Sequence, residues 1–263
     1  MSQYSLTKMT SLLEKHYEKQ YKLIKNNKEI VNYNNHKIRH TYAVLFVAQK
    51  IMTYEKDIFN NENVIKKAEV ANLLHDIWRF YQNNWKRILS WEEFEHGDIG
   101  YEILKQEWIT DLSILFAVKY HNKININWLY DEKEFQKSNN KKEIINIVNL
   151  VRDADKLQNL EYMMFNSNDK LYLEQEISDK ISNDVFSEFI EWKSCIKYDN
   201  VKTYVDKILY YASWCFDLNY KTTKKFLLND DFISFVENQL ENVWVSNYIT
   251  NWIIWKLKNS LEN

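Results

Sequence analysis

The sequence predicts an all-α protein, and two observations support this fold class. Proline is absent and glycine occurs only twice among the 263 residues, so the residues that most often interrupt helices are almost missing. Apolar residues recur at intervals of three and four along most of the chain, and no segment keeps the alternation of a half-buried strand. We therefore expect a single all-α domain over residues 1–263.

The N-terminal half contains five predicted helices with apolar stripes. They cover residues 5–26, 37–52, 62–76, 95–107 and 110–121. The stripe of the second contains Val44, Val47 and Ile51, and that of the third contains Ala71 and Leu74. A polar break is expected at 32–35, and a long loop or short helices at 78–92.

The C-terminal half continues in the same way after an irregular polar stretch at 122–141. The predicted helices cover residues 142–164, 170–193, 199–217, 229–242 and 244–258. In the first of them Ile144, Val148 and Val151 follow one another at offsets of four and three.

Charge and targeting signals set limits on the function. The net charge is −2, from 35 basic and 37 acidic residues in mixed clusters, so there is no strong signal for nucleic acid or an anionic membrane. The N-terminus lacks the apolar core of a signal peptide, and no run of about 18 apolar residues could span a bilayer. Cys195 and Cys215 are too few for a disulfide framework. We expect a cytoplasmic protein.

Tryptophan is unexpectedly frequent. There are ten tryptophans beside two glycines, although the abundance of Lys, Asn and Ile indicates AT-rich coding, which does not favour tryptophan. One hypothesis is that some of these positions come from a codon that the source organism reads differently, for example as glycine.

The pair His75-Asp76 ends an apolar run, Ala-Asn-Leu-Leu-His-Asp-Ile, at positions 71–77. Both side chains are costly to bury unless something binds them. Adjacent residues in a helix point about 100° apart, but at a helix end the backbone can turn and both can reach one cation. The pair therefore predicts a metal site.

Four further residues lie on or beside apolar stripes of predicted helices. They are His40, His96, His121 and Asp155. Each alone would be read more readily as a hydrogen-bonded core residue or a helix cap. One shared metal centre would explain all of them together. The remaining histidines, His16 and His36, lie in polar surroundings and are expected at the surface.

In this order the motifs resemble those of the HD-domain superfamily of metal-dependent phosphohydrolases. Arg39-His40 resembles its first block, Leu73-Leu74-His75-Asp76-Ile77 its second, and Ala154-Asp155-Lys156-Leu157 its closing block. Glu95-His96-Gly97 and Val118-Lys-Tyr-His121 resemble the additional histidine blocks of a subset that includes uncharacterised bacterial proteins. The resemblance implies a multi-helix HD core at about 36–165, followed by accessory helices at about 170–263.

The resemblance implies that His40, His75, Asp76 and Asp155 hold a divalent metal. Imidazole and carboxylate ligands suit Mn²⁺, Fe²⁺, Co²⁺, Ni²⁺ or Zn²⁺, with Mg²⁺ as an alternative. His96 and His121 could bind a second ion, with Asp76 bridging the two at about 3.5–4 Å. Alternatively, one of these two histidines orients the water or protonates the leaving group.

The residues after the pair are the candidates for substrate binding. Arg79 stands where the family has a basic residue and would neutralise phosphate charge in the transition state. Lys119 and Lys123 are weaker candidates for the same role. Trp78 stands where the family usually has glycine, and we expect its ring to wall one side of the pocket.

We therefore expect a hydrolase for a phosphate monoester or phosphodiester, with a phosphorylated nucleotide or small metabolite as substrate. One alternative is an HD-type di-iron oxygenase, because the same cage can hold redox iron. Another is a non-catalytic module that senses a ligand or binds nucleic acid. The aromatic C-terminal helix could pack on its own domain or on a second copy of the chain as a homodimer.

Overall fold

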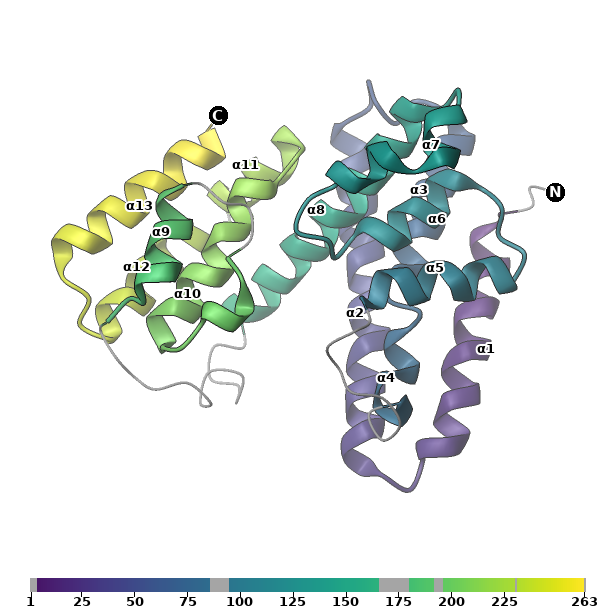
Figure 1. Cartoon of the computed structure of the whole chain (residues 1–263), viewed down its shortest axis with the longest axis horizontal. Helices are drawn as coiled ribbons and strands as arrows, with labels where there is room; N and C mark the ends of the chain where they lie inside the picture. Colours follow the sequence, from purple (N-terminus) through teal and green to yellow (C-terminus); the bar gives the residue numbers. More distant parts are fainter. Residues whose placement is uncertain (1–3, 86–94, 166–179, 192–195, 230, 263) are drawn as a thin grey trace. The chain divides into compact units, whose positions relative to one another are not determined.

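The computed structural model describes residues 4–85, 95–165, 180–191, 196–229 and 231–262. These residues form α-helices and short 3₁₀ helices and no β-strand, which confirms the predicted fold class (Figure 1). The chain separates into two compact units, residues 1–158 and 159–263. The division falls within one long helix, and the predicted single domain with a core and accessory helices stays a prediction.

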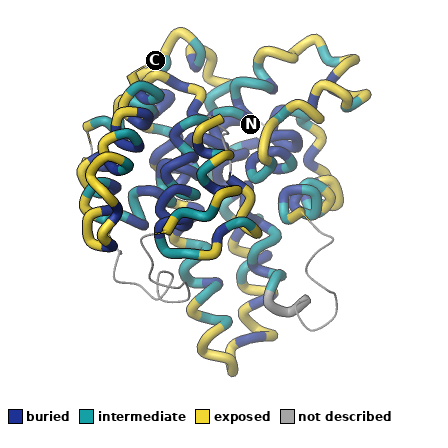
Figure 2. The backbone as a smooth tube through the Cα atoms, turned by 60° about the vertical axis from the view of Figure 1, so that its left-hand side comes forward, coloured by how far each residue is buried: buried dark blue, intermediate teal, exposed yellow. Residues whose placement is uncertain are grey.

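The first unit contains the helices that position the predicted site (Figure 1, purple to teal). They are α1 (Leu6–Ile24), α2 (Lys28–Tyr54), α3 (Glu62–Leu74), α4 (Arg79–Trp85), α5 (His96–Gln106), α6 (Leu112–Tyr120), a 3₁₀ turn η2 (Asn127–Asp131), α7 (Lys133–Lys137) and α8 (Lys141–Phe165). Helices α3 and α6 lie at the centre, where α3 packs against α1, α2 and α6, and α6 also packs against α5. Buried residues recur along these helices, as the dark blue segments of the backbone show (Figure 2).

The helix starts follow from local sequence. Asn27, Asn61 and Asp111 each accept a backbone N–H of the following first turn, at the starts of α2, α3 and α6. Such caps satisfy donors that have no partner inside the helix and contribute about 1 kcal/mol each.

The polar break predicted at 32–35 is wrong, because α2 runs through it. Asn34 is buried there, and its Nδ2 donates to the Phe80 carbonyl at 3.2 Å. Short helices do occur at two places where irregular chain was considered, as α4 and as η2 with α7. At Asn34 the contact with Phe80 is a tertiary one, which local periodicity does not reveal.

The second unit is also helical (Figure 1, green to yellow). Its elements are α9 (Asn183–Ile190), η4 (Tyr198–Asn200), α10 (Tyr204–Ala212), η5 (Ser213–Asp217), α11 (Lys221–Asn229), α12 (Phe232–Asn242) and α13 (Asn247–Glu262). Of the helix predicted at 170–193, the part before residue 180 lies outside the described residues, as does Cys195. Helix α11 was not predicted.

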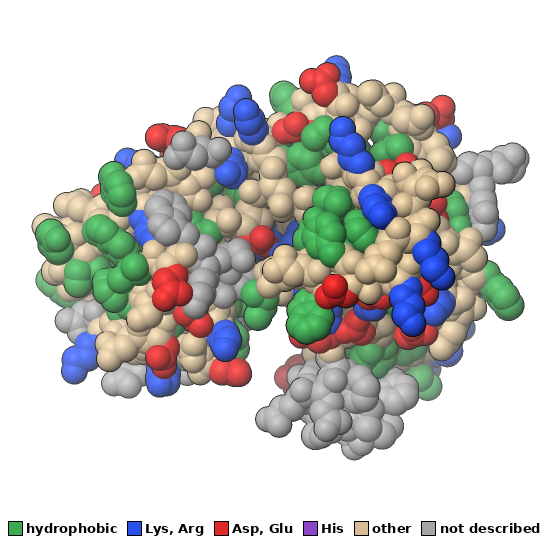
Figure 3. All heavy atoms as spheres, turned by 45° about the horizontal axis from the view of Figure 1, so that its top comes forward, with side chains coloured by type: hydrophobic (Ala, Val, Ile, Leu, Met, Phe, Trp, Pro, Cys, Tyr) green, Lys and Arg blue, Asp and Glu red, His purple; other side chains and the backbone are tan. Residues whose placement is uncertain are grey.

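The aromatic side chains of helix α13, the C-terminal helix, do not share one environment. Trp252 packs on Phe186 and Phe189 of α9, whereas Tyr248 and Trp255 are exposed. None of the described helices is both long and apolar enough to cross a membrane. Acidic and basic side chains are interspersed over the face seen in Figure 3. A homodimer through α13 stays a prediction.

Two tryptophans adopt the left-handed backbone conformation that favours glycine. Trp108 has φ 62° and Trp244 has φ 66°, directly after α5 and α12, and both side chains are more than four-fifths exposed. The Ile109 N–H bonds to the Leu104 carbonyl at 3.0 Å, and the Val245 N–H to the Leu240 carbonyl at 3.1 Å. These six-to-one bonds identify Schellman motifs, in which the left-handed position is usually glycine.

We expect Trp108→Gly and Trp244→Gly each to raise the free energy of unfolding by about 0.5–1 kcal/mol. The left-handed conformation costs a residue with a Cβ about 1–2 kcal/mol, which exceeds the added unfolded-chain entropy of glycine. Urea denaturation measures the change. Trp255→Gly is the matched control, because Trp255 is exposed inside α13, where glycine should lower stability by about 1 kcal/mol. Destabilisation by all three variants would contradict the argument.

Candidate metal centre

The six predicted ligands converge in the first unit, although they come from five parts of the chain. His40 lies on α2, His75 and Asp76 follow α3, His96 begins α5, His121 follows α6, and Asp155 lies on α8. Their ligand atoms form three overlapping groups, within each of which all atoms lie within 4.8 Å of one another. The structure therefore brings together every residue that the sequence nominated for the metal.

Helix ends orient two of the imidazoles. Helix α3 ends at Leu74, as expected for a pair that shares one target, and His75 Nδ1 lies 2.8 Å from the Asn72 carbonyl. His121 repeats this arrangement after α6, with Nδ1 2.8 Å from the Val118 carbonyl. A carbonyl partner fixes the proton on Nδ1 and leaves the Nε2 lone pair free, which is the usual state of a metal-binding histidine.

The Asp76 carboxylate lies between two groups of side chains. Its Oδ2 is 3.7 Å from His40 Nε2 and 3.8 Å from His75 Nε2, and its Oδ1 is 3.6 Å from both His96 Nε2 and His121 Nε2. We call His40, His75 and Asp155 the first set, and His96 and His121 the second set. Each oxygen of Asp76 thus faces one set.

The first set is completed by Asp155 from α8. Its Oδ1 lies 3.0 Å from His40 Nε2 and 3.8 Å from His75 Nε2. The other ring nitrogen of His40, Nδ1, pairs with Gln158 Oε1 one turn further along α8 and so orients the imidazole. In the second set, His96 Nε2 lies 3.0 Å from His121 Nε2.

The electrostatics favour the metal-binding protonation states. Burial lowers the pKa of His75 to about 4 and that of His96 well below its usual range. Burial alone would raise the pKa of Asp76, but Lys37 and His75 beside it hold that pKa well below its ordinary value. Neutral imidazoles and ionised carboxylates near pH 7 are the forms that bind a cation.

One atom is hard to explain without a ligand. His75 Nε2 is buried and has no hydrogen-bond partner among the described residues, while carboxylate oxygens lie 3.8 Å away on two sides. A buried polar atom without a partner costs about 1–3 kcal/mol. A divalent ion between the imidazole and the carboxylates would satisfy it. The donor set fits the predicted transition metals and does not distinguish among them.

Two cations flank Asp76. Arg79, the first residue of α4, has its Nε 3.9 Å from Asp76 Oδ1, in line with its predicted place beside the site. Lys37 has its Nζ 3.2 Å from Asp76 Oδ2 and was missed. The sequence contains a signal for it, because Lys37 lies three residues before His40 and so on the same helix face.

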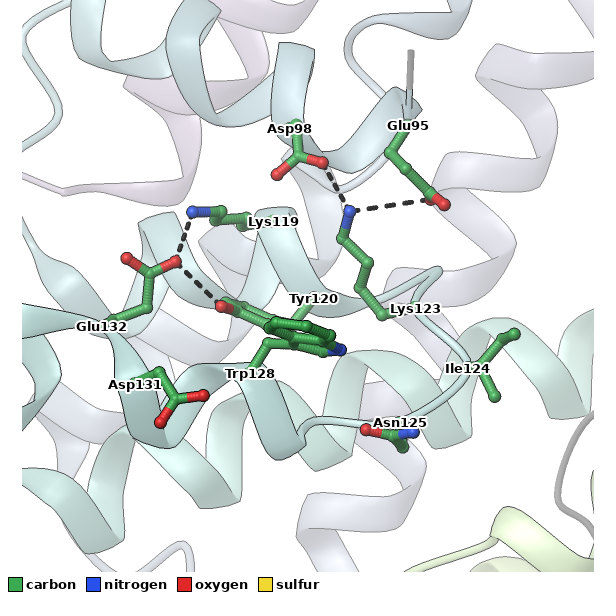
Figure 4. A pocket seen from close by; sticks show the side chains of 10 residues that line it. All are labelled: Glu95, Asp98, Lys119, Tyr120, Lys123, Ile124, Asn125, Trp128, Asp131 and Glu132. Atoms are coloured by element: carbon green, nitrogen blue, oxygen red, sulfur yellow. Dashed lines mark hydrogen bonds and ion pairs between the residues drawn. The ribbon is translucent and has the colours of Figure 1, made fainter. Parts of the chain in front are cut away.

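Lys119 and Lys123 lie in a separate pocket of about 610 Å³, whose lining includes none of the six ligands (Figure 4). Lys119 pairs with Glu132, and Lys123 pairs with Asp98 and Glu95. Four carboxylates line this pocket beside the two lysines, so its net charge is negative. The phosphate-binding role of these lysines stays a prediction. The negative charge of the pocket does not favour it.

Trp78 and His16 are two further residues whose positions were predicted. The Trp78 ring stacks on Tyr81 at 5.8 Å between centroids, and its role as a wall of the pocket stays a prediction. His16 was expected at the surface, which is wrong: it is buried, with Nδ1 2.5 Å from Tyr81 Oη and Nε2 3.1 Å from Glu107. These partners come from α4 and from the end of α5, which local polarity on α1 does not reveal.

Gly97 allows α5 to approach α6 closely enough for the second set to form. A Cβ at this position would lie 2.5 Å from the Lys119 carbonyl and 2.9 Å from the Val118 carbonyl. Both contacts are too short and involve backbone, which cannot rotate away.

We expect Gly97→Ala to separate His96 from His121 and to remove metal from the second set while the first set keeps its ion. Elemental analysis of purified protein would then find about one ion fewer per chain than in the wild type. The control is Glu102→Ala on the exposed face of α5. An unchanged metal content in Gly97→Ala would contradict the assignment.

The metal-free protein should lose stability as the pH falls from about 6.5 to about 4. The folded-state pKa of His75 is lowered to about 4 from its ordinary 6.5, so in this window the unfolded chain binds a proton that the folded chain does not. The free energy of unfolding then falls by up to about 1.4 kcal/mol per pH unit from this group. Urea denaturation with a chelator present measures how the free energy of unfolding changes with pH. His75→Asn should reduce this slope by the contribution of one proton. Equal slopes for the two proteins would refute the role of His75.

Comparison with known proteins identifies one family. Residues 38–160 match the family model of the HD domain. No curated protein and no solved structure matches the chain.

Proposed function

We propose that residues 38–160, which match the family model of the HD domain, form a metal-dependent phosphohydrolase domain. Its substrate would be a phosphate monoester or phosphodiester of a nucleotide or small metabolite. The observation that carries the proposal is the position of Asp76, whose two carboxylate oxygens face two separate sets of ligands. Two-metal hydrolases use such a shared carboxylate to hold a pair of ions.

The two sets of ligands that share Asp76 would each suit one ion. His40, His75 and Asp155 would hold the first, His96 and His121 the second, and Asp76 would contribute one oxygen to each. When bound, the metal would lower the pKa of a coordinated water toward neutrality and polarise the phosphoryl group. The carbonyl partners of His75 and His121 keep both rings aimed at the centre, so little reorganisation is needed for binding.

His96 is better suited to bind metal than to protonate a leaving group. Burial and the neighbouring His121 lower its pKa well below the usual range, so the ring is neutral near pH 7 and has no proton to give as an acid. Arg79 would stabilise the transition state, because its guanidinium beside Asp76 can neutralise charge on the phosphoryl oxygens.

The decisive experiment is a hydrolysis screen over nucleotides, sugar phosphates and phosphodiesters. Mn²⁺, Mg²⁺, Fe²⁺, Co²⁺, Ni²⁺ and Zn²⁺ are each tested with protein whose metal content has been measured. We expect phosphate release with at least one metal. No hydrolysis by metal-loaded protein would overturn the proposal, and oxygen consumption by a mixed-valence iron pair would replace it with an oxygenase. A non-catalytic module would keep its function in folded His75→Ala and Asp76→Ala proteins.

A further inference from the structure

Two cations approach the Asp76 carboxylate from different helices. Lys37 on α2 reaches Oδ2 at 3.2 Å, and Arg79 on α4 reaches Oδ1 at 3.9 Å. The Lys37 and Arg79 side chains are 12% and 24% exposed, whereas that of His75 is fully enclosed. Both cations are therefore more accessible than His75 and lie beside the ligands.

The ammonium group of Lys37 depends on its partner. Its side chain is only 12% exposed, and its ammonium group pairs with the Asp76 carboxylate at 3.2 Å. In the proposed function Asp76 would be a ligand shared by the metal ions. Lys37 would then face a neutralised carboxylate, and a buried cation without a counter-ion is costly. A substrate anion would restore the pairing.

Arg79 also has a donor without an acceptor. Its Nε is buried and has no hydrogen-bond partner among the residues that the structure describes, and its ion pair with Asp76 is long, at 3.9 Å. Once metal is bound to Asp76, both Lys37 and Arg79 would lack an acceptor. One phosphoryl group has several acceptor oxygens and can pair with both donors.

We propose that Lys37 is a phosphate-binding residue that acts together with Arg79 on the substrate. This inference rests on the proposed function and adds a residue that the sequence motifs did not nominate. Lys37 would bind a phosphoryl oxygen as a point charge, while the planar guanidinium of Arg79 supplies directed hydrogen bonds.

The test compares Lys37→Met, Lys37→Arg and the control Lys28→Met, which removes an exposed lysine from the start of the same helix. Calorimetry measures the binding of inorganic phosphate to metal-loaded protein, and elemental analysis measures the metal content. We expect Lys37→Met to weaken phosphate binding about 10- to 100-fold at full metal content, which is the effect of losing one charged hydrogen bond. Lys37→Arg should recover part of the affinity, and Lys28→Met should bind as the wild type does.

The outcomes separate this inference from the proposed function. Equal phosphate affinity in Lys37→Met and wild type, with hydrolysis intact in the wild type, would overturn the role of Lys37 alone. Loss of metal from Lys37→Met without loss of phosphate affinity per loaded protein would make Lys37 a structural partner of Asp76 and would overturn it as well. A wild-type protein that is metal-loaded but hydrolyses no phosphoester would instead overturn the proposed function.

A second inference comes from the left-handed tryptophans and is independent of the site. Three described non-glycine residues have positive φ: Trp108, Trp244 and Asp231. Aspartate tolerates this conformation, whereas a bulky aromatic residue there is an outlier. Both tryptophans complete a Schellman motif whose flanking apolar pairs, Leu104 with Ile109 and Leu240 with Val245, are buried as that motif requires.

We infer that residues 108 and 244 are glycine in the protein that the source organism makes. The backbone at both positions has the conformation that glycine adopts without cost. The exposed indole rings add no core packing that would justify the strain. A codon read as glycine by the organism and as tryptophan in this sequence would also explain why the chain has ten tryptophans and two glycines.

The gene and the native protein together test this inference. We expect a codon other than UGG at both positions, and peptide mass spectrometry of protein isolated from the organism should read glycine there. UGG codons, or tryptophan in the native peptides, would overturn it. Methionine, with its single codon, serves as the internal control, because Met9 and Met52 should read as methionine in both the gene and the peptides.

Discussion

Asp76→Asn should abolish metal-dependent hydrolysis and empty both sets of ligands. Each oxygen of Asp76 faces one set, so a single substitution would remove a ligand from both of the proposed ions. An asparagine keeps the size of the side chain but carries no charge, and its nitrogen cannot bind a cation. Loss of a residue that only orients a ligand already costs about 10- to 100-fold, so we expect a loss of at least about 100-fold in activity. Hydrolysis assays and elemental analysis measure the two effects.

The control for this prediction is Asp57→Asn, which neutralises an exposed aspartate after α2. It should keep the metal content and activity of the wild type. Circular dichroism of Asp76→Asn should remain helical, because the other helix contacts are unaffected. Substantial activity in a correctly folded, metal-loaded Asp76→Asn protein would contradict the shared-carboxylate arrangement.

The metal cluster was predictable because its residues conflict with their local surroundings. His40, His75, His121 and Asp155 are polar groups on apolar helix stripes, and only a common partner explains their burial together. His75-Asp76 also revealed its geometry, because two adjacent side chains can share a target only where the helix ends. The helix end at Leu74 has this form.

Lys37, His16 and Asn34 could not be found in this way. Each is polar in a polar stretch of sequence, so the periodicity gives no sign of burial. Lys37 is buried by its contact with Asp76, 39 residues away along the chain, and Asn34 by the Phe80 carbonyl, 46 residues away. Such contacts depend on which helices pack together, and a single sequence contains that information only indirectly.

Arg152→Met should lower the stability of the first unit by about 3 kcal/mol or more. Arg152 lies on α8 one turn before Asp155 and is almost completely buried. Its Nη1 donates to the carbonyls of Tyr120 at 2.9 Å and Lys123 at 2.6 Å, and its Nη2 donates to that of Ile124 at 3.4 Å. These carbonyls belong to the end of α6 and the turn after it, where the helix itself offers no donors.

Methionine fills much of the same volume but donates nothing, so the buried Tyr120 carbonyl and the part-buried carbonyls of Lys123 and Ile124 lose their partner. A buried carbonyl without a partner costs about 1–3 kcal/mol, and a part-buried one costs less. For a unit of this size we expect the Tm to fall by roughly 6–12 °C. The exposed Arg39→Met is the matched control and should change stability by less than about 0.5 kcal/mol.

The same substitution should also weaken metal binding. His121 lies within the segment that Arg152 anchors, and Asp155 lies on the helix that anchors it. Freeing that segment loosens the second set relative to the first, so the metal content of Arg152→Met should fall even at temperatures where the protein is folded. If Arg152→Met lost stability but kept its full metal content, the prediction would be contradicted. The turn after α6 would then stabilise the fold without affecting metal binding.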